Sequence, residues 1–258
     1  MAEAAETLDW MGQAIDCATC AHAALAAAGS CEPGLTCVND RRARRIERFF
    51  MAHRSLADDY LEHPYFEVRA LAGRFCSVFR LQRLVNDAEP EPRASAALRL
   101  PLQRALSMMA DPDRRVRVAL ASRLTGQALL AMTRDQDGYV RMVVTRRLPP
   151  ELLVIMVGDV DPEVRRIAAR RMLPGTLPAL AGDPDPMVRL EVAERLPPER
   201  LHLLARDPDM RVRFTVAERI DLLSLTAFRD DPESVIRELV AARLALPQQE
   251  EHADGPGT

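Results

Sequence analysis

Lysine is absent from this 258-residue sequence, so all 35 of its basic residues are arginines. Aromatic residues are also scarce, at 4% of the total, which leaves few rings on which nucleic-acid bases could stack. The formal charge is −3, whereas a domain that binds nucleic acid usually carries an excess of positive charge. We therefore expect no nucleic-acid partner.

Long apolar segments are missing as well. No uninterrupted apolar run is longer than Leu152–Val157, whereas a membrane-spanning helix needs roughly 18–20 apolar residues. No basic residue precedes Arg41, so the N-terminus lacks the positive segment that begins a secretory signal peptide. We expect a cytoplasmic protein without a membrane partner.

The sequence repeats with a strict period of 24 residues. A dipeptide of Val or Ile followed by Arg begins at Val68, Val116, Val140, Val164, Val188, Val212 and Ile236, and Pro92-Arg93 fills the remaining place. This period predicts a stack of eight similar units. It divides the chain into an N-terminal region at 1–62, the repeats at 63–247 and a polar tail at 248–258, which we expect to be frayed.

Each unit is expected to contain one α-helix and one shorter segment. Asp111-Pro112 is typical of a helix start, although Asp113 is an equally good capping residue. Val116 and Leu120 then follow helical spacing. Because 24 residues cannot hold two full helices with their connections, the second segment should be a short α or 3₁₀ piece. Alternating runs of β-branched residues are absent, so we predict an all-α solenoid.

Two columns of arginine recur with the same period. The first column comprises residues 69, 93, 117, 141, 165, 189, 213 and 237, and the second comprises residues 99, 123, 147, 171, 195, 219 and 243. On a helical wheel, both columns fall in or beside the apolar sector, which favours a structural role over phosphate binding.

Each column has a predicted partner. An acid stands four residues before each of the first-column arginines from Arg93 onward, which is the favourable order for an ion pair along one helix. The predicted pairs are Asp113–Arg117, Asp137–Arg141, Asp161–Arg165, Asp185–Arg189 and Asp209–Arg213. Second-column arginines stand near helix C-termini, where a guanidinium group can satisfy free carbonyl groups.

Partner recognition is expected where the units differ. Positions equivalent to 114, 115, 118 and 122 change in kind from unit to unit, as in Arg114-Arg115, Gly138-Tyr139, Pro162-Glu163, Pro186-Met187 and Met210-Arg211. These positions point away from the apolar sector of the predicted helix. We interpret them as the surface that binds an unidentified protein partner.

Four of the five cysteines are clustered, with the spacing Cys17-x₂-Cys20-x₁₀-Cys31-x₅-Cys37. Cys17 and Cys20 form a half-site that zinc and iron–sulfur centres share, and a turn at Pro33-Gly34 would bring Cys31 and Cys37 together. In a reducing compartment, such clustering indicates metal binding rather than disulfides. The spacing alone leaves a four-iron cluster and Zn²⁺ open.

The rest of the N-terminal region predicts a helix that covers the first repeat. One apolar face is marked by Ile46, Phe49, Phe50, His53, Leu56, Ala57, Tyr60 and Leu61. The other face carries most of the arginines, namely Arg41, Arg42, Arg44, Arg45 and Arg48. The apolar side would close the open end of the repeat stack, as a terminal unit of a solenoid must. The basic side is interpreted as a solvated face.

The repeat resembles the leucine-rich repeat variant family. The resemblance rests on the unit Asp-Pro-Asp-x-x-Val-Arg-x-x-Leu/Val-Ala-x-Arg-Leu-Pro, which covers about three quarters of the chain, with mild departures at His63, Cys76 and Pro92. It implies a right-handed superhelix of alternating α and 3₁₀ segments. It also implies a small N-terminal domain in which Cys17, Cys20, Cys31 and Cys37 hold a [4Fe–4S] cluster, with Zn²⁺ as the alternative. Cys76 occupies a leucine position in the repeat and is interpreted as a buried apolar residue.

These features favour a protein-interaction scaffold over an enzyme. The five histidines are scattered, and the acids recur with the repeat rather than forming an isolated pair. We expect the cluster to be structural or redox-active. The alternatives are an electron-transfer protein, and a nucleic-acid-binding helical-repeat protein favoured only by the arginine excess in the repeats.

Overall fold

The computed structural model describes residues 7–245, which form two compact units that divide after Val144. We call the described residues up to Val144 unit 1 and those from Thr145 unit 2. Within 7–245 the regular elements are helices, accompanied by three isolated β-bridges in the N-terminal region. The all-α prediction is confirmed, whereas the tail predicted at 248–258 lies outside the described residues.

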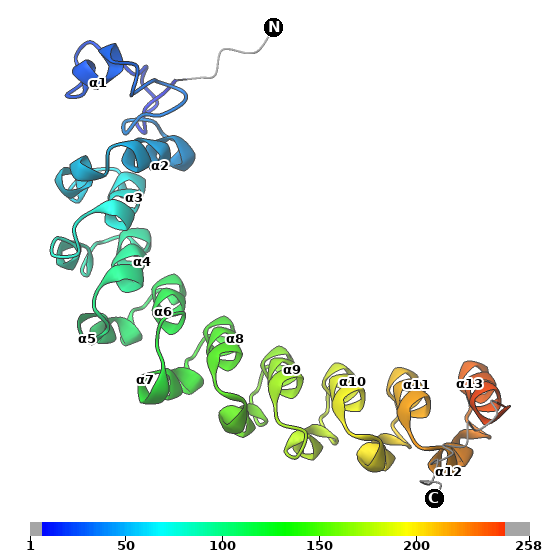
Figure 1. Ribbon diagram of the computed structural model, residues 1–258. Helices are drawn as coiled ribbons and strands as arrows, with labels where there is room; N and C mark the ends of the chain where they lie inside the picture. Colours follow the sequence, from blue (N-terminus) through cyan, green and yellow to red (C-terminus); the bar gives the residue numbers. More distant parts are fainter. Residues whose placement is uncertain (1–6, 246–258) are drawn as a thin grey trace, which may run out of the picture. The chain divides into compact units, whose positions relative to one another are not determined.

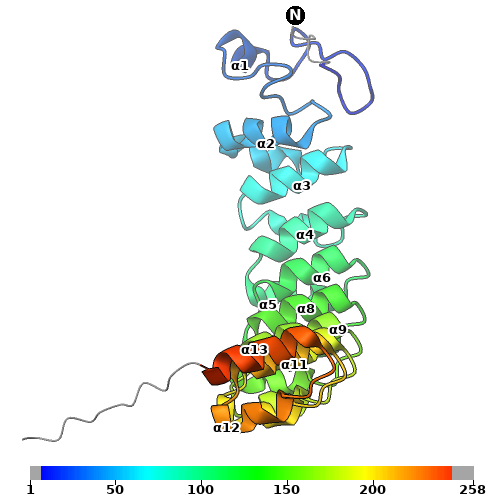
Figure 2. The same cartoon turned by 90° about the vertical axis from the view of Figure 1, so that its right-hand side faces the viewer.

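Unit 1 alternates α-helices with short 3₁₀ segments (Figure 1). In chain order its elements are α1 (Ala23–Ala27), α2 (Ala43–Ala52), η1 (Arg54–Tyr60), α3 (Phe66–Phe75), η2 (Leu81–Leu84), α4 (Pro90–Arg99), α5 (Leu102–Ala105), η3 (Leu106–Ala110), α6 (Arg114–Ala121), α7 (Gly126–Ala131) and η4 (Met132–Arg134). Helices α2, α3, α4 and α6 lie side by side in both views (Figures 1 and 2). Helix α8 (Gly138–Arg147) begins in this unit.

Unit 2 continues the same alternation. Its elements are η5 (Pro150–Met156), α9 (Pro162–Arg171), η6 (Leu177–Leu180), α10 (Pro186–Arg195), η7 (Pro198–Leu204), α11 (Met210–Arg219), α12 (Leu222–Leu225), η8 (Thr226–Phe228) and α13 (Ser234–Ala245). Helices α9, α10, α11 and α13 form a row, with the short segments along one side of it (Figure 1). Among residues 7–245, no helix combines the length and the apolar character needed to cross a membrane.

The predicted period sets the register of the helices. The longer helix of each repeat begins 24 positions after the one before it, at Phe66, Pro90, Arg114, Gly138, Pro162, Pro186, Met210 and Ser234. The apolar columns of the repeat form the core within each unit. For example, Leu120 and Leu196 are 0% exposed, Met108 is 3% exposed and Leu204 is 2% exposed. Cys76, at 2% exposure, fills its leucine position as predicted.

The second aspartate of each Asp-x-Asp segment caps the helix. The Asp161 carboxylate accepts the Glu163 N–H at 2.9 Å, and Asp185 accepts the Met187 N–H at 2.7 Å. Such a bond satisfies one of the N–H groups that has no partner at a helix start. The first aspartate is thereby left for a different contact.

The first arginine column uses that aspartate to join neighbouring 24-residue repeats. Arg165 places Nε 2.6 Å and Nη2 2.8 Å from the two carboxylate oxygens of Asp183. The same bidentate pairing joins Arg69 to Asp87, Arg93 to Asp111, Arg117 to Asp135, Arg189 to Asp207 and Arg213 to Asp231. Each acid stands eighteen residues after its arginine. Charged groups that are buried in such pairs hold adjacent repeats in register.

This arrangement corrects the ion pairs predicted along single helices. Those predicted pairs were Asp113–Arg117, Asp137–Arg141, Asp161–Arg165, Asp185–Arg189 and Asp209–Arg213. The five acids instead accept backbone N–H groups at their own helix starts. The capping carboxylate folds back over the end of its own helix, whereas the long arginine side chain reaches the aspartate of the next repeat. The arginines are buried or nearly so, as predicted.

The second arginine column caps the C-terminus of the preceding helix. Arg99 donates to the Gly73 carbonyl at 2.8 Å, and Arg195 donates to the Met172 carbonyl at 2.9 Å. The last carbonyl groups of a helix lack partners within it, and cationic side chains stabilise that end. The predicted role of this column is confirmed, and the carbonyl groups that accept these bonds belong to the preceding repeat.

The N-terminal region departs from the single helix predicted up to Leu61. Helix α2 ends at Ala52, and η1 follows after His53. The apolar face of α2 is nevertheless buried, with Ile46, Phe49 and Phe50 at 0% exposure. Helix α2 packs against α3 and thus covers the first repeat helix.

Candidate metal centre

The clustered cysteines lie in the loops on either side of α1. Cys17 and Cys20 precede this helix, and Cys31 and Cys37 follow it. The turn predicted at Pro33-Gly34 is present, because backbone hydrogen bonds of 2.8 and 2.9 Å join the residues on either side of it. Gly34 has a φ of +84°, a conformation that glycine adopts without steric cost. The turn brings the Cys31 and Cys37 thiols into hydrogen-bonding contact.

Cys31 interacts with each of the other three clustered thiols. Burial raises the pKa of Cys31, and the nearby Cys20 and Cys17 thiols raise it further, while the bond with Cys37 lowers it. Burial also raises the pKa of Cys37 to about 12. Buried thiols of this kind lose their protons when a bound cation compensates for the thiolate charge. Across residues 7–245, no three or more His, Cys, Asp or Glu side chains are arranged around a single ion position.

Asn39 supplies hydrogen bonds to two of the four sulfur atoms. Its Nδ2 lies 3.4 Å from Cys20 Sγ, and its backbone N–H donates to the Cys37 thiol. The loop is anchored by the next residue, Asp40, whose fully buried carboxylate forms an ion pair with Arg45 at 2.9 Å. Asn39 was not predicted from the sequence, in which its only signal is its place two residues after the candidate ligand Cys37.

Two neutral aromatic side chains lie beside the thiols. The His22 Nε2 and the Tyr60 hydroxyl group are hydrogen-bonded, and both rings are close to Phe49. Burial lowers the pKa of His22, and the nearby His53 lowers it further. Burial, together with the nearby Cys20 thiol, raises the pKa of Tyr60 to about 12. Both groups are therefore uncharged near neutral pH and add no charge to the thiol site.

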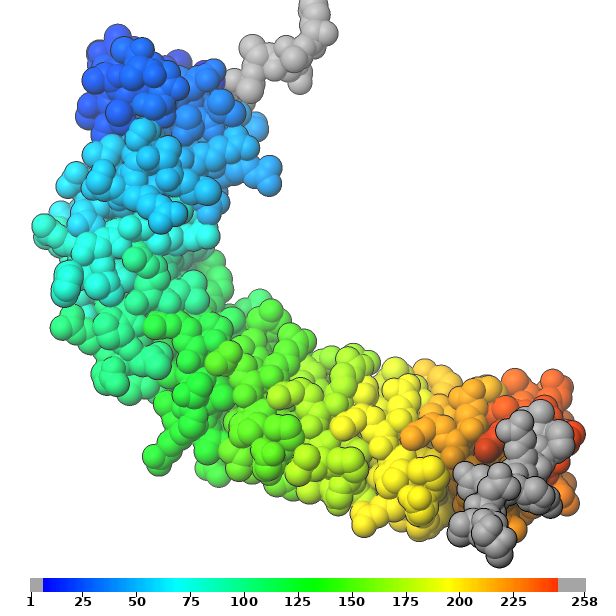
Figure 3. All heavy atoms as spheres, in the orientation of Figure 1, coloured from blue at the N-terminus to red at the C-terminus, as the bar shows by residue number. Residues whose placement is uncertain are grey.

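The site has a buried side and a side open to solvent. Cys31 and Cys37 are 5% and 2% exposed, whereas Cys17 and Cys20 are only partly buried. In Figure 3 this region appears in dark blue at the start of unit 1. A group held by the four sulfur atoms would be accessible from the side of Cys17 and Cys20.

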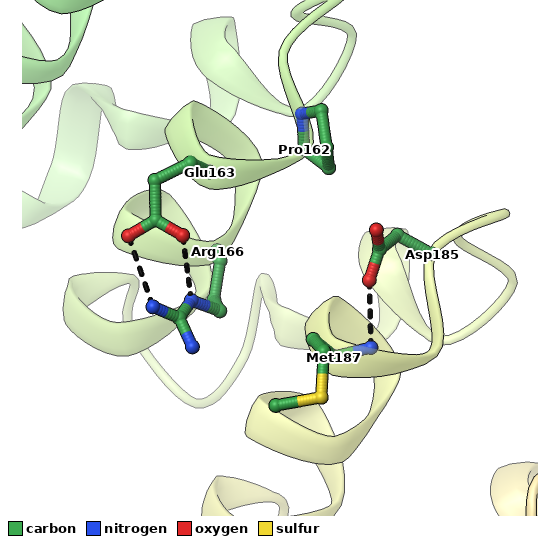
Figure 4. A pocket seen from close by; sticks show the side chains of 5 residues that line it. All are labelled: Pro162, Glu163, Arg166, Asp185 and Met187. Carbon is green, nitrogen blue, oxygen red and sulfur yellow. Dashed lines mark hydrogen bonds and ion pairs between the residues drawn. The ribbon is translucent and has the colours of Figure 1, made fainter.

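The positions that vary from repeat to repeat line shallow surface pockets. In unit 1, one such pocket is lined by Arg114, Arg115, Val118 and Tyr139. In unit 2, another is lined by Pro162, Glu163, Arg166, Asp185 and Met187 (Figure 4). Within this second pocket, Arg166 and Glu163 are paired at 3.0 Å, and Asp185 is used as a helix cap. The predicted outward orientation of these positions is confirmed, although their charged groups are mostly paired.

A solved structure closely matches both the fold and the sequence. It is described as a leucine-rich repeat variant with a novel repetitive protein structural motif, and its TM-score to this chain is 0.81. The two sequences are 38% identical, and the match covers 89% of this chain and 98% of the other. The chain belongs to the leucine-rich repeat variant family. The repeat model of this family matches residues 186–209, which include α10.

The same family accounts for the N-terminal thiols. A family model described as "LRV protein FeS4 cluster" matches residues 7–59, which contain all four clustered cysteines. Four cysteines, of which Cys31 interacts with each of the other three, are the donor set that an iron–sulfur cluster requires. The protein is thus an iron–sulfur member of the leucine-rich repeat variant family.

A curated relative matches part of the chain. It is described as an uncharacterized 27.7 kDa protein in the nifB 3′ region of Rhodobacter capsulatus. The two are 51% identical over 105 residues, or 41% of this chain. The match spans 43% of the relative's length.

Proposed function

We propose that the protein is a non-enzymatic interaction scaffold that carries a [4Fe–4S] cluster on Cys17, Cys20, Cys31 and Cys37. The use of the recurring arginines is the observation that supports this proposal. Arginines of both columns connect adjacent repeats, as Arg165 and Arg195 do, whereas the positions that differ from repeat to repeat lie at the surface. A group needed for stacking must recur in every unit, but a partner can be recognised by local differences. A reducing, cytoplasmic location would keep the four thiols available.

The cluster is tested by anaerobic purification followed by analysis of iron, sulfide and zinc. We expect brown protein with iron and acid-labile sulfide in equal amounts, and loss of the colour in Cys17→Ser and Cys37→Ser. Cys76→Ala is the matched control, because this buried cysteine lies in the repeat core. A colourless protein with one zinc ion per chain would contradict the proposed cluster and support the Zn²⁺ alternative.

The scaffold role is tested by affinity purification of the full chain after crosslinking in its own cells. We expect a partner protein that binds the purified chain saturably at micromolar concentration. Failure to recover any saturable partner under anaerobic conditions would contradict the scaffold role. The cluster proposal would be unaffected by that result.

Electron transfer is a second candidate function. Its support is the partial exposure of Cys17 and Cys20, because electrons pass more readily to a cluster near the surface. A potentiometric titration should then show a reversible one-electron couple. The absence of an accessible couple would leave the cluster with a structural role.

Nucleic acid is not the partner that we propose. Six first-column guanidinium groups, including that of Arg165, are paired with carboxylates, and Arg237 donates to backbone carbonyls. Second-column groups such as that of Arg195 also donate to carbonyls, so these groups are not directed at phosphates. We expect no binding of single- or double-stranded DNA at low salt in fluorescence anisotropy. Salt-dependent binding would contradict this expectation.

A further inference from the structure

Helix α13 is the last repeat helix of the described residues. It packs against α11, α12 and η8, and it ends the row of repeat helices (Figure 1). At the other end of the repeats, α2 covers the first repeat helix, α3. In a solenoid, each repeat contacts its neighbours, so a helix without a following repeat exposes the groups that would hold one.

Three residues of α13 are more exposed than their equivalents in earlier repeats. Arg237 and Ala241 are exposed, and Leu244 is half-buried. We call these three residues the open face; they are four and three positions apart and therefore share one side of the helix. Earlier helices bury the place of Ala241 completely, at Ala97, Ala121, Ala169, Ala193 and Ala217. The six earlier residues at the place of Leu244, from Leu100 to Ile220, are at most 2% exposed.

Helix α3 shows what fills this face when a further repeat follows. Its residue at the place of Ala241 is Gly73. A methyl group added there would lie 2.6 Å from Leu84 Cδ1, so the Leu84 side chain lies against this position. Asp87, three residues after Leu84, binds Arg69, the first-column arginine of α3, through both carboxylate oxygens. An apolar side chain and a carboxylate from one short turn therefore complete the face.

The same kind of turn occurs seven times in the chain. Each has a buried apolar residue, two variable residues and an aspartate, and a backbone bond of 3.1–3.3 Å from the aspartate N–H closes it. Residues three apart in such a turn are eclipsed, so both side chains can face the same helix. The seven turns are Leu84–Asp87, Met108–Asp111, Met132–Asp135, Met156–Asp159, Leu180–Asp183, Leu204–Asp207 and Phe228–Asp231. Each leads into the next repeat helix.

The Arg237 side chain is held by the same backbone contacts as its paired equivalents. Its Nη1 donates to the Pro232 carbonyl at 2.9 Å, as Nη1 of Arg189 donates to the Pro184 carbonyl at 3.2 Å. Arg189 uses its Nε and Nη2 to bind Asp207. Arg237, in contrast, has no carboxylate partner among residues 7–245. Its planar guanidinium group can therefore take a carboxylate in the same bidentate geometry.

We propose that the open face binds a segment of another protein that has the form apolar-x-x-Asp and is followed by a helix. This inference deepens the proposed scaffold function and rests on it. The apolar side chain would lie on Ala241, and the aspartate would bind Arg237. Residues 246–258 lack this form, because their one aspartate, Asp254, has Glu251 at the apolar place. In a second copy, the apolar residues of the seven turns are buried in its own repeats.

The probe is a fluorescein-labelled peptide with the sequence of residues 198–219, which contains Leu204, Asp207 and the helix that follows them. Fluorescence anisotropy with the full chain should give a micromolar Kd that weakens as salt is added. Peptides with Leu204→Ser or Asp207→Asn should bind at least tenfold more weakly. Equal binding of all three peptides would overturn the proposal, because neither the apolar group nor the carboxylate would then be recognised.

Two adjacent alanines of α13 provide matched variants of the full chain. Ala241→Glu places a charge on the open face and should weaken binding of the wild-type peptide at least tenfold. Ala242→Glu is the control and should change the Kd less than twofold, because earlier repeats carry Glu194 and Glu218 at this outward position. Both alanines are exposed, and circular dichroism checks that both variants fold. Arg237→Met should weaken binding and remove most of the salt dependence.

Other outcomes separate this proposal from the scaffold function. No binding of the wild-type peptide, or equal binding by the wild-type and Ala241→Glu chains, would overturn the proposal. If a partner recovered by crosslinking binds Ala241→Glu as well as the wild-type chain, the scaffold function stands and the assignment of this surface fails. If no partner is recovered but the peptide binds as expected, the scaffold function fails and the specificity of the open face stands.

Two further measurements identify a different occupant. If Asp254→Asn strengthens peptide binding tenfold, the chain's own C-terminal segment competes for Arg237 and is the occupant. A dimer seen by sedimentation and abolished by Ala241→Glu would identify a second copy. Either result would overturn the proposal, whereas a monomer with unchanged binding in Asp254→Asn supports a segment of another protein.

Discussion

The cysteine region at 7–40 and the repeats are stabilised by different means. Within 7–40, the buried side chains are Cys31, Cys37, Val38 and Asp40. The repeats, in contrast, bury leucine or methionine columns and are joined by ion pairs and carbonyl caps. So little apolar burial cannot offset the conformational entropy of the ordered region. We therefore expect the first region to depend on a bound group, whereas the repeats depend on one another.

The difference also affects how each region responds to a substitution. A structural metal site is formed or lost as a whole, because the ligands do not converge in the unfolded chain. A solenoid is closer to a sum of units and interfaces, so damage in one interface is local. Substitutions in the two regions should accordingly differ in size and in extent.

Loss of the cluster should have the largest effect. We expect Cys31→Ser, or removal of iron by a chelator, to unfold 7–40 while the repeats keep their helical signal. Trypsin provides a direct readout, because the first arginine is Arg41 and lysine is absent. Cleavage near Arg41 should become at least tenfold faster, while Cys76→Ala is digested like the wild type. Equal digestion of the Cys31→Ser and wild-type proteins would show that the region folds without its cluster.

Removal of one guanidinium group from a repeat interface should come next. Arg165→Met leaves the Asp183 carboxylate, whose side chain is 2% exposed, without its partner. An uncompensated buried charge of this kind lowers the free energy of unfolding by about 3–5 kcal/mol.

The adjacent residue supplies the control for that experiment. Arg166 is paired with Glu163 at the surface, with side-chain exposures of 28% and 41%, so Arg166→Met should change the stability by less than about 1 kcal/mol. Urea unfolding followed by circular dichroism measures both variants. Equal effects of the two substitutions would contradict the structural role of the first arginine column.

The repeats were predictable from the sequence because one local pattern recurs without interruption. A helix start, an apolar stripe and a fixed period determine the elements whatever their neighbours are. The choice of ion-pair partner was not predictable in this way. Asp111 and Asp113 are equivalent in a linear sequence, and only the stacked structure shows that one pairs with an arginine and the other caps a helix.

The candidate site shows the same limit. The spacing of the cysteines and the turn at Pro33-Gly34 indicated where the thiols meet. The contact of Asn39 with Cys20 depends on a loop conformation that the buried Asp40–Arg45 pair fixes. Such a contact joins residues nineteen positions apart without any periodic signal.

Acidification should weaken the repeat interfaces by a smaller amount per site. The bond from Arg213 holds the pKa of Asp231 below its ordinary value of 3.8, although burial opposes this. A carboxyl group with a lowered folded-state pKa stabilises the protein above its unfolded pKa, and this contribution is lost as the pH falls through the folded value. We expect melting temperatures to be constant down to about pH 5 and to fall below about pH 4. A melting temperature that rises in acid would contradict this assignment.

The smallest predicted effect concerns the tuning of the cluster by Asn39. Hydrogen bonds to cluster sulfur atoms stabilise the more negative, reduced state. Asn39→Asp removes the donor to Cys20 and adds a negative charge, so the midpoint potential should become more negative by about 59 mV, a tenfold change for one electron. Gln13→Glu adds the same charge at an exposed position of the region and should shift it less. If both variants keep the wild-type potential with intact spectra, the Asn39 contact positions the loop and does not tune the cluster.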